Sequence, residues 1–183
     1  TLSAGIAQFD SGGRMTCANQ PFLRGTGLDS AWTQEGPSFE RVLDRICAND
    51  VAVPEGRIVY SQWLNDDGGI EADLTVTRLA EDRFLVVTAA ATQIRDLAWL
   101  KGHVPSEARC SVEDVTSAYA VVSVMGPLSR ELLQPLTLTG LDNDEFPFGS
   151  SREIDLGYAK VRASRITYVG ELGWELYIPT EFA

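Results

Sequence analysis

Histidine and cysteine are scarce in this sequence, with one and three residues respectively among 183. Cys17, Cys47 and Cys110 form no CxxC motif, and His103 has no second histidine to pair with. Zinc sites and Cys–His nucleophiles need such residues in closely spaced sets, so the sequence argues against both and predicts no metal centre. A sparse, odd number of cysteines is typical of a reducing compartment, and we therefore expect a cytoplasmic protein.

Basic residues and long hydrophobic runs are also few. Fifteen Lys and Arg stand against 26 Asp and Glu, which gives a formal net charge of −11. Because phosphate binding needs a basic field, we expect no nucleic-acid partner, and an anionic ligand would need a local basic pocket. The longest apolar run, 118–122, is far shorter than the roughly 20 residues that cross a bilayer, so we expect no membrane partner.

The remaining composition is that of a globular protein with a buried core, at 44% hydrophobic and 22% charged residues. The length suits one ordinary domain, or one small domain with part of another. Because the chain begins at Thr1 and ends at Ala183, we expect a piece of a longer or processed protein. Strand and helix patterns predict an α+β fold with mixed, mostly antiparallel sheets and flanking helices.

The stretch 68–78 carries the clearest pattern in the chain. After Gly68-Gly69, apolar and polar residues alternate with a period of two, which predicts a half-buried strand. One face holds Ile70, Ala72, Leu74 and Val76, and the other holds Glu71, Asp73, Thr75 and Thr77. The polar face therefore presents the Asp73 carboxylate next to the Thr75 hydroxyl. A solvated strand edge has the same pattern, so the alternation leaves a site and a plain surface open.

Turn residues and apolar spacing predict the other elements of the chain. We expect helices at 38–46, 92–101 and from Pro127 onward, and strands at 57–64, 83–88, 112–115, 119–124, 153–156, 160–167 and 174–178. Three consecutive strands, from 57 to 88, follow one another through short turns, which favours an antiparallel meander.

The predicted helix 92–101 carries the only histidine near its end. Ile94, Leu97 and Ala98 are expected to face inward. Gly102 is expected to end the helix, since glycine commonly follows the last helical residue. His103 would then lie just beyond the helix, as a hydrogen-bonded and partly exposed side chain without a catalytic partner.

The first 37 residues differ from the rest of the chain in their sequence pattern. Segments 6–9 and 14–18 predict a hairpin, and Asn19 predicts the start of a helix. Residues 4–45 resemble the opening of PAS sensor domains; a hairpin that packs at the edge of another domain is an equal alternative. The Gly-, Ser- and Pro-rich loop 25–37 predicts a boundary, which divides the chain into segments 1–37 and 38–183.

A second polar segment lies about a hundred residues after Asp73. Residues 168–175 form a Gly-punctuated turn that leads into a strand carrying Glu175. Two carboxylates on strands beside glycine turns can converge on one pocket. There, Glu175 would accept hydrogen bonds from a donor-rich ligand edge, and Tyr168 or Trp174 would stack on a flat ring. Asp73 would then act on a reacting nitrogen.

Four motifs in order carry a family resemblance: Ile46-Cys47-Ala48-Asn49-Asp50-Val51, the stretch 68–78, Val124-Met125-Gly126-Pro127, and the segment from Arg165 to Glu175. Together they resemble the tetrahydrofolate-binding domain of the aminomethyltransferase family. That family includes the glycine cleavage system T protein and the C-terminal halves of dimethylglycine and sarcosine dehydrogenases. The resemblance covers about residues 42–183 and is closest to the dehydrogenase branch at segments 57–65 and 96–100.

The resemblance implies a role for each matched residue. Asp73 matches the catalytic aspartate near the reacting folate nitrogens, and Glu175 matches the carboxylate that accepts from the pterin. Tyr168 matches the aromatic side chain that packs on the folate, Thr75 a pocket-lining position, and Arg165 a binding or structural position. The implied reaction transfers a one-carbon unit from an amine-derived donor to tetrahydrofolate, giving 5,10-methylenetetrahydrofolate. The implied partners are these two small molecules.

The sequence also departs from the family. Residues 1–40 differ from the segment that normally helps to wall the folate site, and the chain stops before the second half of the folate domain and the C-terminal barrel. No flavin-binding segment is visible, so a flavin is expected only in an upstream domain. Two alternatives to one-carbon transfer therefore stay open: a PAS-like ligand-binding or sensor module, and an inactive remnant of the folate domain. The sequence leaves the oligomeric state open.

Overall fold

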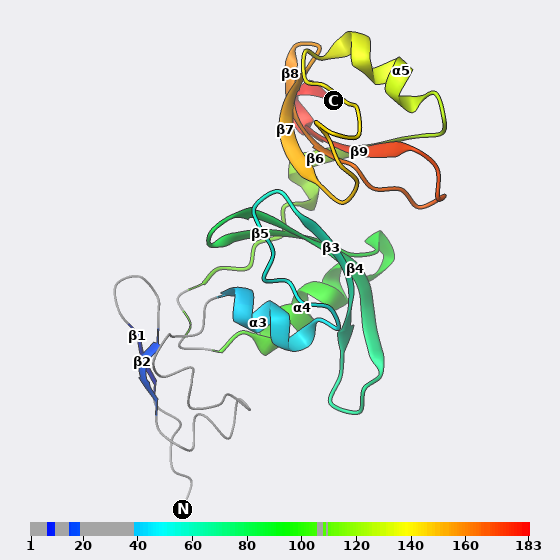
Figure 1. Cartoon of the computed structure of the whole chain (residues 1–183). Helices are drawn as coiled ribbons and strands as arrows, with labels where there is room; N and C mark the ends of the chain where they lie inside the picture. Colours follow the sequence, from blue (N-terminus) through cyan, green and yellow to red (C-terminus); the bar gives the residue numbers. More distant parts are fainter. Residues whose placement is uncertain (1–6, 10–14, 19–38, 106–107, 109) are drawn as a thin grey trace, which may run out of the picture. The chain divides into compact units, whose positions relative to one another are not determined.

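A computed structural model describes residues 7–9, 15–18, 39–105, 108 and 110–183 (Figure 1). The described residues divide into two compact units. The first falls within Thr1–Ala52, Tyr60–Leu74 and Val86–Glu113, and the second within Val53–Val59, Thr75–Leu85 and Asp114–Ala183.

Two short strands precede the first helix in the chain. β1 (Ala7–Phe9) and β2 (Met15–Ala18) pair antiparallel, with Ala7 opposite Ala18, which confirms the strands of the predicted hairpin. The turn between them, the helix start at Asn19, the loop 25–37 and Ser38 lie outside the described residues. Helix α3 (Phe39–Ile46) follows and buries Val42, Leu43 and Ile46, as its apolar spacing predicts.

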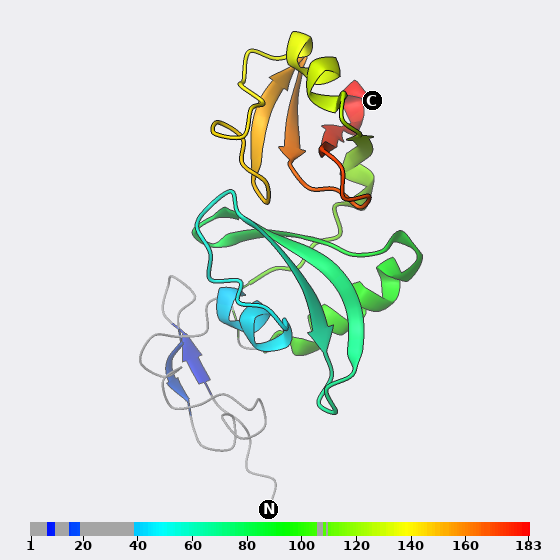
Figure 2. The same cartoon turned by 45° about the vertical axis from the view of Figure 1, so that its right-hand side comes forward.

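A three-stranded sheet with the order β3-β4-β5 confirms the predicted meander (Figures 1 and 2). It consists of β3 (Ile58–Leu64), β4 (Ile70–Ala80) and β5 (Arg83–Val87). Asn65 shapes the turn between β3 and β4, because its Oδ1 accepts from the backbone N–H of Gly69 at 2.7 Å. Along β4, Ala72, Leu74 and Val76 are buried and Asp73 is exposed, as the alternation predicts. The prediction was wrong at both ends of the pattern, where Ile70 is 69% exposed and Thr77 is buried. The division between the units crosses all three strands.

Helix α4 (Gln93–His103) differs from its prediction in two respects. It continues through Gly102 to His103, because Gly102 keeps a helical backbone rather than the positive φ of a glycine cap. His103 lies in the last turn, exposed, with its Nδ1 2.8 Å from Trp99 O and its ring 3.8 Å from the Trp99 ring, which confirms that its hydrogen bonding is satisfied. A short 3₁₀ turn, Ala90–Thr92, precedes the helix.

The face of α4 that points inward was also predicted wrongly. Ile94 is 84% exposed, and Asp96 and Leu100 are the buried residues of the helix. Asp96 can be buried because Thr92 Oγ1 donates to its Oδ2 at 2.6 Å and Arg95 donates to its Oδ1 at 2.9 Å. These bonds satisfy the carboxylate, so Asp96 can be buried on a face that apolar spacing does not predict.

The second unit contains a four-stranded sheet with the order β6-β9-β8-β7, antiparallel throughout. Its strands are β6 (Tyr119–Met125), β7 (Ser151–Leu156), β8 (Ala159–Ser164) and β9 (Gly173–Pro179). The predicted strands 119–124, 153–156 and 174–178 are confirmed. Strand 160–167 ends earlier than predicted, because the N–H of Ile166 donates to Ser164 O at 3.0 Å in a tight turn. The fold is therefore α+β with antiparallel sheets, as predicted.

The predicted strand 112–115 does not form. Residues 111–115 have no regular structure, and the 3₁₀ turn Thr116–Ala118 follows them. The N–H of Thr116 donates to Asp114 Oδ1 at 2.9 Å, a side-chain turn that replaces strand pairing. Helix α5 (Ser129–Leu133) and the 3₁₀ turns Gln134–Leu136 and Thr180–Phe182 complete the unit. No helix among the described residues is long and apolar enough to cross a membrane.

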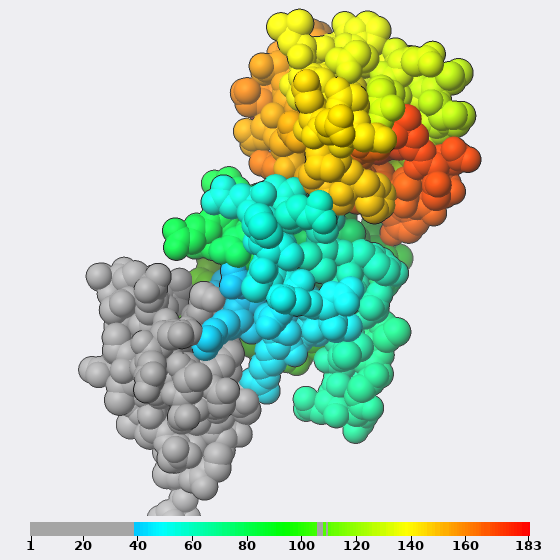
Figure 3. All heavy atoms as spheres, viewed as in Figure 1, coloured from blue at the N-terminus to red at the C-terminus, as the bar shows by residue number. Residues whose placement is uncertain are grey.

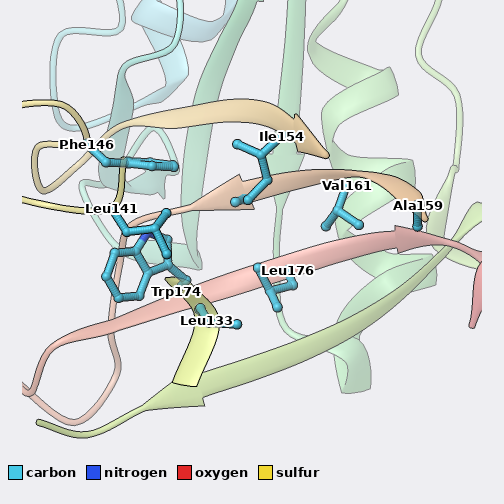
Figure 4. Close-up of a cluster of buried hydrophobic side chains, with 9 residues drawn as sticks. Leu133, Leu141, Phe146, Ile154, Ala159, Val161, Trp174 and Leu176 are labelled. Carbon is cyan, nitrogen blue, oxygen red and sulfur yellow. The ribbon is translucent and has the colours of Figure 1, made fainter. Parts of the chain in front are cut away.

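One face of the four-stranded sheet packs into the core of the second unit (Figure 4). Trp174 is fully buried there and meets Phe146 edge to face, with 6.2 Å between the ring centroids. The cluster comprises Leu133, Leu141, Phe146, Ile154, Ala159, Val161, Ala163, Trp174 and Leu176. Because Trp174 is sealed in this core, it cannot stack on a ligand, and that alternative to Tyr168 was wrong.

Candidate functional site

Asp73 projects from the exposed face of β4. Its Oδ1 accepts a hydrogen bond from Gln62 Nε2 at 3.0 Å, across the hairpin from β3. This neutral donor holds one carboxylate oxygen in place without cancelling the negative charge. Thr75 is half-buried and lies two residues further on, so its side chain leaves β4 on the same face.

Glu175 is buried at 8% exposure, although it is charged and lies on β9 beside the core residue Trp174. Adjacent strand residues point to opposite faces, so Glu175 leaves the sheet on the side away from the core cluster. Its Oε2 accepts from the Tyr177 hydroxyl at 2.8 Å. Within the described part of the chain, Glu175 forms no ion pair, so its charge is not neutralised there.

Small side chains flank Glu175 on both neighbouring strands. Ser123 on β6 and Ser164 on β8 are its register partners, and directly opposite residues share a face of the sheet. The Ser164 hydroxyl donates to Ser151 Oγ at 3.0 Å and so is already engaged. The direct strand neighbours of the carboxylate are therefore small, hydroxyl-bearing residues.

Tyr177 shares the electrostatic environment of Glu175. Burial raises the pKa of Tyr177 most, followed by the charge of Glu175 and the hydrogen bond to it, with a smaller contribution from Tyr168. The phenol therefore stays protonated and remains a donor throughout the physiological range.

The turn before β9 displays Tyr168 at the surface of the second unit, where its side chain is 90% exposed; residues 166–172 lie in the orange-to-red segment of Figure 3. Gly170 takes φ +73°, a conformation that glycine adopts without strain. Gly173 allows β9 to approach β6 closely, since a Cβ there would lie 2.8 Å from Met125 Cγ. Gly170 thus shapes the turn that carries Tyr168, and Gly173 allows the strand after this turn to pack against β6.

Arg165 is buried and packs toward the core. Its Nη2 donates to Asn143 Oδ1 at 2.7 Å, its Nη1 donates to Phe146 O, and its guanidinium lies 5.5 Å from the Trp174 ring centroid. Burial and the nearby Arg130 lower the pKa of Arg165, while Asp142 acts in the opposite direction. These contacts support a structural role that ties the loop before β7 to the sheet; ligand binding by Arg165 stays a prediction.

The second unit thus brings Glu175 and Tyr177 together, away from the core, and displays Tyr168 in the turn before β9. Asp73 belongs to the first unit and Thr75 to the second, so a pocket shared by Asp73 and Glu175 stays a prediction. Sequence reasoning missed Gln62 and Tyr177. The period of two would have placed Tyr177 on the face of Glu175, and the hairpin register would have placed Gln62 near Asp73. The described residues hold no group of three potential metal ligands.

Residues 31–183 match the protein family described as GCVT N-terminal domain, which confirms the resemblance found in the sequence. The chain is 34% identical over 152 residues to the mitochondrial pyruvate dehydrogenase phosphatase regulatory subunit of Mus musculus, covering 82% of this chain and 17% of that protein. It is 38% identical over 148 residues to the formaldehyde-forming 4-methylaminobutanoate oxidase of Paenarthrobacter nicotinovorans, covering 81% and 18%. It is 34% identical over 145 residues to human mitochondrial dimethylglycine dehydrogenase, covering 78% and 16%.

The chain spans less than a fifth of the length of these three relatives. Among solved structures, it resembles the glycine cleavage system aminomethyltransferase T of Bartonella henselae, with a TM-score of 0.65 and 28% identity. That match covers 81% of this chain and 39% of the other. The family match over most of the chain and the shared fold agree, and the chain therefore belongs to the GCVT N-terminal domain family.

Proposed function

We propose that this chain binds tetrahydrofolate and forms part of a site for one-carbon transfer from an amine-derived donor, giving 5,10-methylenetetrahydrofolate. Membership of the family and the likeness to an aminomethyltransferase support folate-dependent chemistry in general. The observation that carries the proposal is the buried, charged Glu175, which has a neutral hydrogen-bond donor and no ion pair in the described part of the chain.

The residues around Glu175 fit the pterin of a folate. A carboxylate has two oxygens and about four acceptor positions, and the Tyr177 hydroxyl fills one position on Oε2. Buried acceptors are normally satisfied, so the remaining capacity suits the amino and ring N–H groups of a pterin edge. The residues opposite Glu175 on the neighbouring strands, Ser123 and Ser164, are both small.

The other matched residues would complete the site. Tetrahydrofolate, when bound, supplies the nucleophilic nitrogens that take up the one-carbon unit. Tyr168, exposed in the turn before β9, would pack on the ligand with its ring. Asp73, oriented by Gln62, would accept a proton as a nitrogen attacks, a general-base role usually worth about 10²–10⁴ in rate. Thr75 would line the pocket beside Asp73.

A binding role without transfer is the second candidate. The mouse relative is named as a regulatory subunit rather than a transferase, so a member of this family can carry a regulatory description. In that case the Glu175 region would bind folate, and Asp73 would be a solvated residue of the β4 surface. Both candidate functions require the binding of folate. They differ in whether Asp73 affects the rate of one-carbon transfer.

Anaerobic calorimetric titration with tetrahydrofolate tests the binding that both candidates share. We expect saturable binding with a dissociation constant on the order of micromolar. Glu175→Gln should weaken it about tenfold or more, since an amide donor would face the donors of the pterin. Glu171→Gln, an exposed carboxylate in the same turn, is the matched control and should bind like wild type. A folded wild-type chain that does not bind would refute the proposal.

A further inference from the structure

Tyr177 and Glu175 form a buried pair on the non-core face of β9. They lie two residues apart on the strand, so both side chains leave the sheet on the same side. Both are buried, at 5% and 8% exposure, and 2.8 Å separates the Tyr177 hydroxyl from Glu175 Oε2. The two polar side chains are therefore largely shielded from water. Their hydrogen bond satisfies the Tyr177 hydroxyl and one oxygen of Glu175.

The ring of Tyr177 is held by its neighbours. Tyr119 on β6 meets it edge to face, with 6.4 Å between centroids and an interplanar angle of 85°. Val121 and Arg162 are its register partners on β6 and β8. A ring packed on both sides has few rotamers open to it, so the position of its hydroxyl is fixed. A fixed hydroxyl in turn fixes the carboxylate that it binds.

The chemistry of this donor matters as much as its position. Burial and the charge of Glu175 raise the pKa of Tyr177 well above its ordinary value, so the phenol does not ionise at physiological pH. It therefore orients Glu175 without adding a second negative charge. Unlike an arginine or lysine, it also leaves the carboxylate charge unpaired and available to a ligand.

We propose that Tyr177 is a positioning residue, which holds Oε2 of Glu175 so that the other oxygen faces the donor-rich edge of a bound folate. The inference rests on the proposed function, because it concerns the same ligand site. In this proposal, Tyr177 sets the orientation of the Glu175 carboxylate before the ligand binds. Pre-orientation of this kind strengthens binding because less side-chain freedom is lost when the ligand arrives.

The test is the dissociation constant of tetrahydrofolate for Tyr177→Phe, measured anaerobically. Removal of the hydroxyl should weaken binding about tenfold. Tyr119→Phe is the matched control: it keeps the edge-to-face ring contact and should retain wild-type affinity.

The double variant separates positioning from general stability. If Tyr177 acts through Glu175, Tyr177→Phe should have little further effect on affinity in a Glu175→Gln background, whereas a structural role would add its effect in both backgrounds. Additive effects, or a Tyr177→Phe variant with wild-type affinity, would overturn the inference and leave the proposed function intact. Absence of folate binding by the wild-type chain would overturn both.

Discussion

At the scale of single residues, a neutral donor holds each carboxylate of the proposed site. Gln62 donates to Asp73 at 3.0 Å and Tyr177 to Glu175 at 2.8 Å. Neutral donors orient a carboxylate and leave its charge free to act on a ligand. Asp96 is the contrast, since a salt bridge of 2.9 Å neutralises it inside the first unit. Among the described residues, the two candidate site carboxylates therefore keep a charge that no ion pair neutralises, whereas Asp96 does not.

We predict that Asp73→Asn lowers the rate of one-carbon transfer at saturating folate by about 10²-fold or more, within the usual range for a lost general base. Asparagine keeps the size and one acceptor but cannot take up a proton. The dissociation constant of tetrahydrofolate should change much less, because we propose that Glu175 and Tyr168, rather than Asp73, bind the pterin. Stopped-flow or single-turnover kinetics, with a donor that wild type uses, measure the rate.

The matched control for this prediction is Asp66→Asn, at the exposed turn between β3 and β4. It removes the same charge from the same hairpin and should retain the wild-type rate. Equal rates for wild type and Asp73→Asn would favour the binding-only role and leave Asp73 as a solvated surface residue.

Much of the site could be predicted from residue types and spacing, but their partners could not. Alternation on β4 placed Asp73 on an open face, and the same rule excludes Trp174 as a ligand contact. Trp174 and Glu175 are adjacent on β9, so only one of them can avoid the core. The hydrogen bonds of Gln62 and Tyr177 depend on rotamers and on strand register, which local sequence patterns do not fix.

At the scale of the elements, the glycines of the 168–175 motif have distinct structural tasks. We predict that Gly173→Ala destabilises the chain by about 1–3 kcal/mol, because the added Cβ would lie 2.8 Å from Met125 Cγ and 3.0 Å from Val124 O. Backbone atoms of β6 can yield only if the strand pairing shifts. Urea unfolding, followed by circular dichroism, measures the change in the free energy of unfolding.

Gly102→Ala is the control within the same chain. Gly102 lies in α4, has no positive φ, and an added Cβ would meet nothing within 4 Å. Alanine should therefore stabilise this helix by about 0.5–1 kcal/mol. A loss of stability in Gly102→Ala, or no loss in Gly173→Ala, would show that the contacts of the added Cβ do not decide the effect of replacing a glycine.

Elements with strong periodicity were predicted well, whereas those set by side-chain hydrogen bonds were not. The meander β3-β4-β5 and helix α3 follow their apolar patterns. The segment 112–115 has an apolar residue at each end but forms no strand, and the Asp114 carboxylate accepts the N–H of Thr116 in a local turn. The inward face of α4 was missed because the buried carboxylate of Asp96 is satisfied by partners that apolar spacing does not reveal.

At the scale of the whole molecule, the ordered motifs predicted both the family and the α+β fold. The division into two compact units was not predicted, since it passes through strands β3, β4 and β5 and depends on contacts between distant segments. Asp73 and Glu175 belong to different units, so a ligand that reaches both carboxylates stays a prediction.

The most direct test is a titration of the isotope-labelled chain with tetrahydrofolate, followed by NMR. The side-chain amide of Gln62, which donates to Asp73, reports on one carboxylate, and the backbone amide of Glu175 reports on the other. We predict that both signals shift along the same saturation curve, with one dissociation constant. A ligand that shifts the Glu175 amide to saturation and leaves the Gln62 side chain unchanged would contradict a shared site.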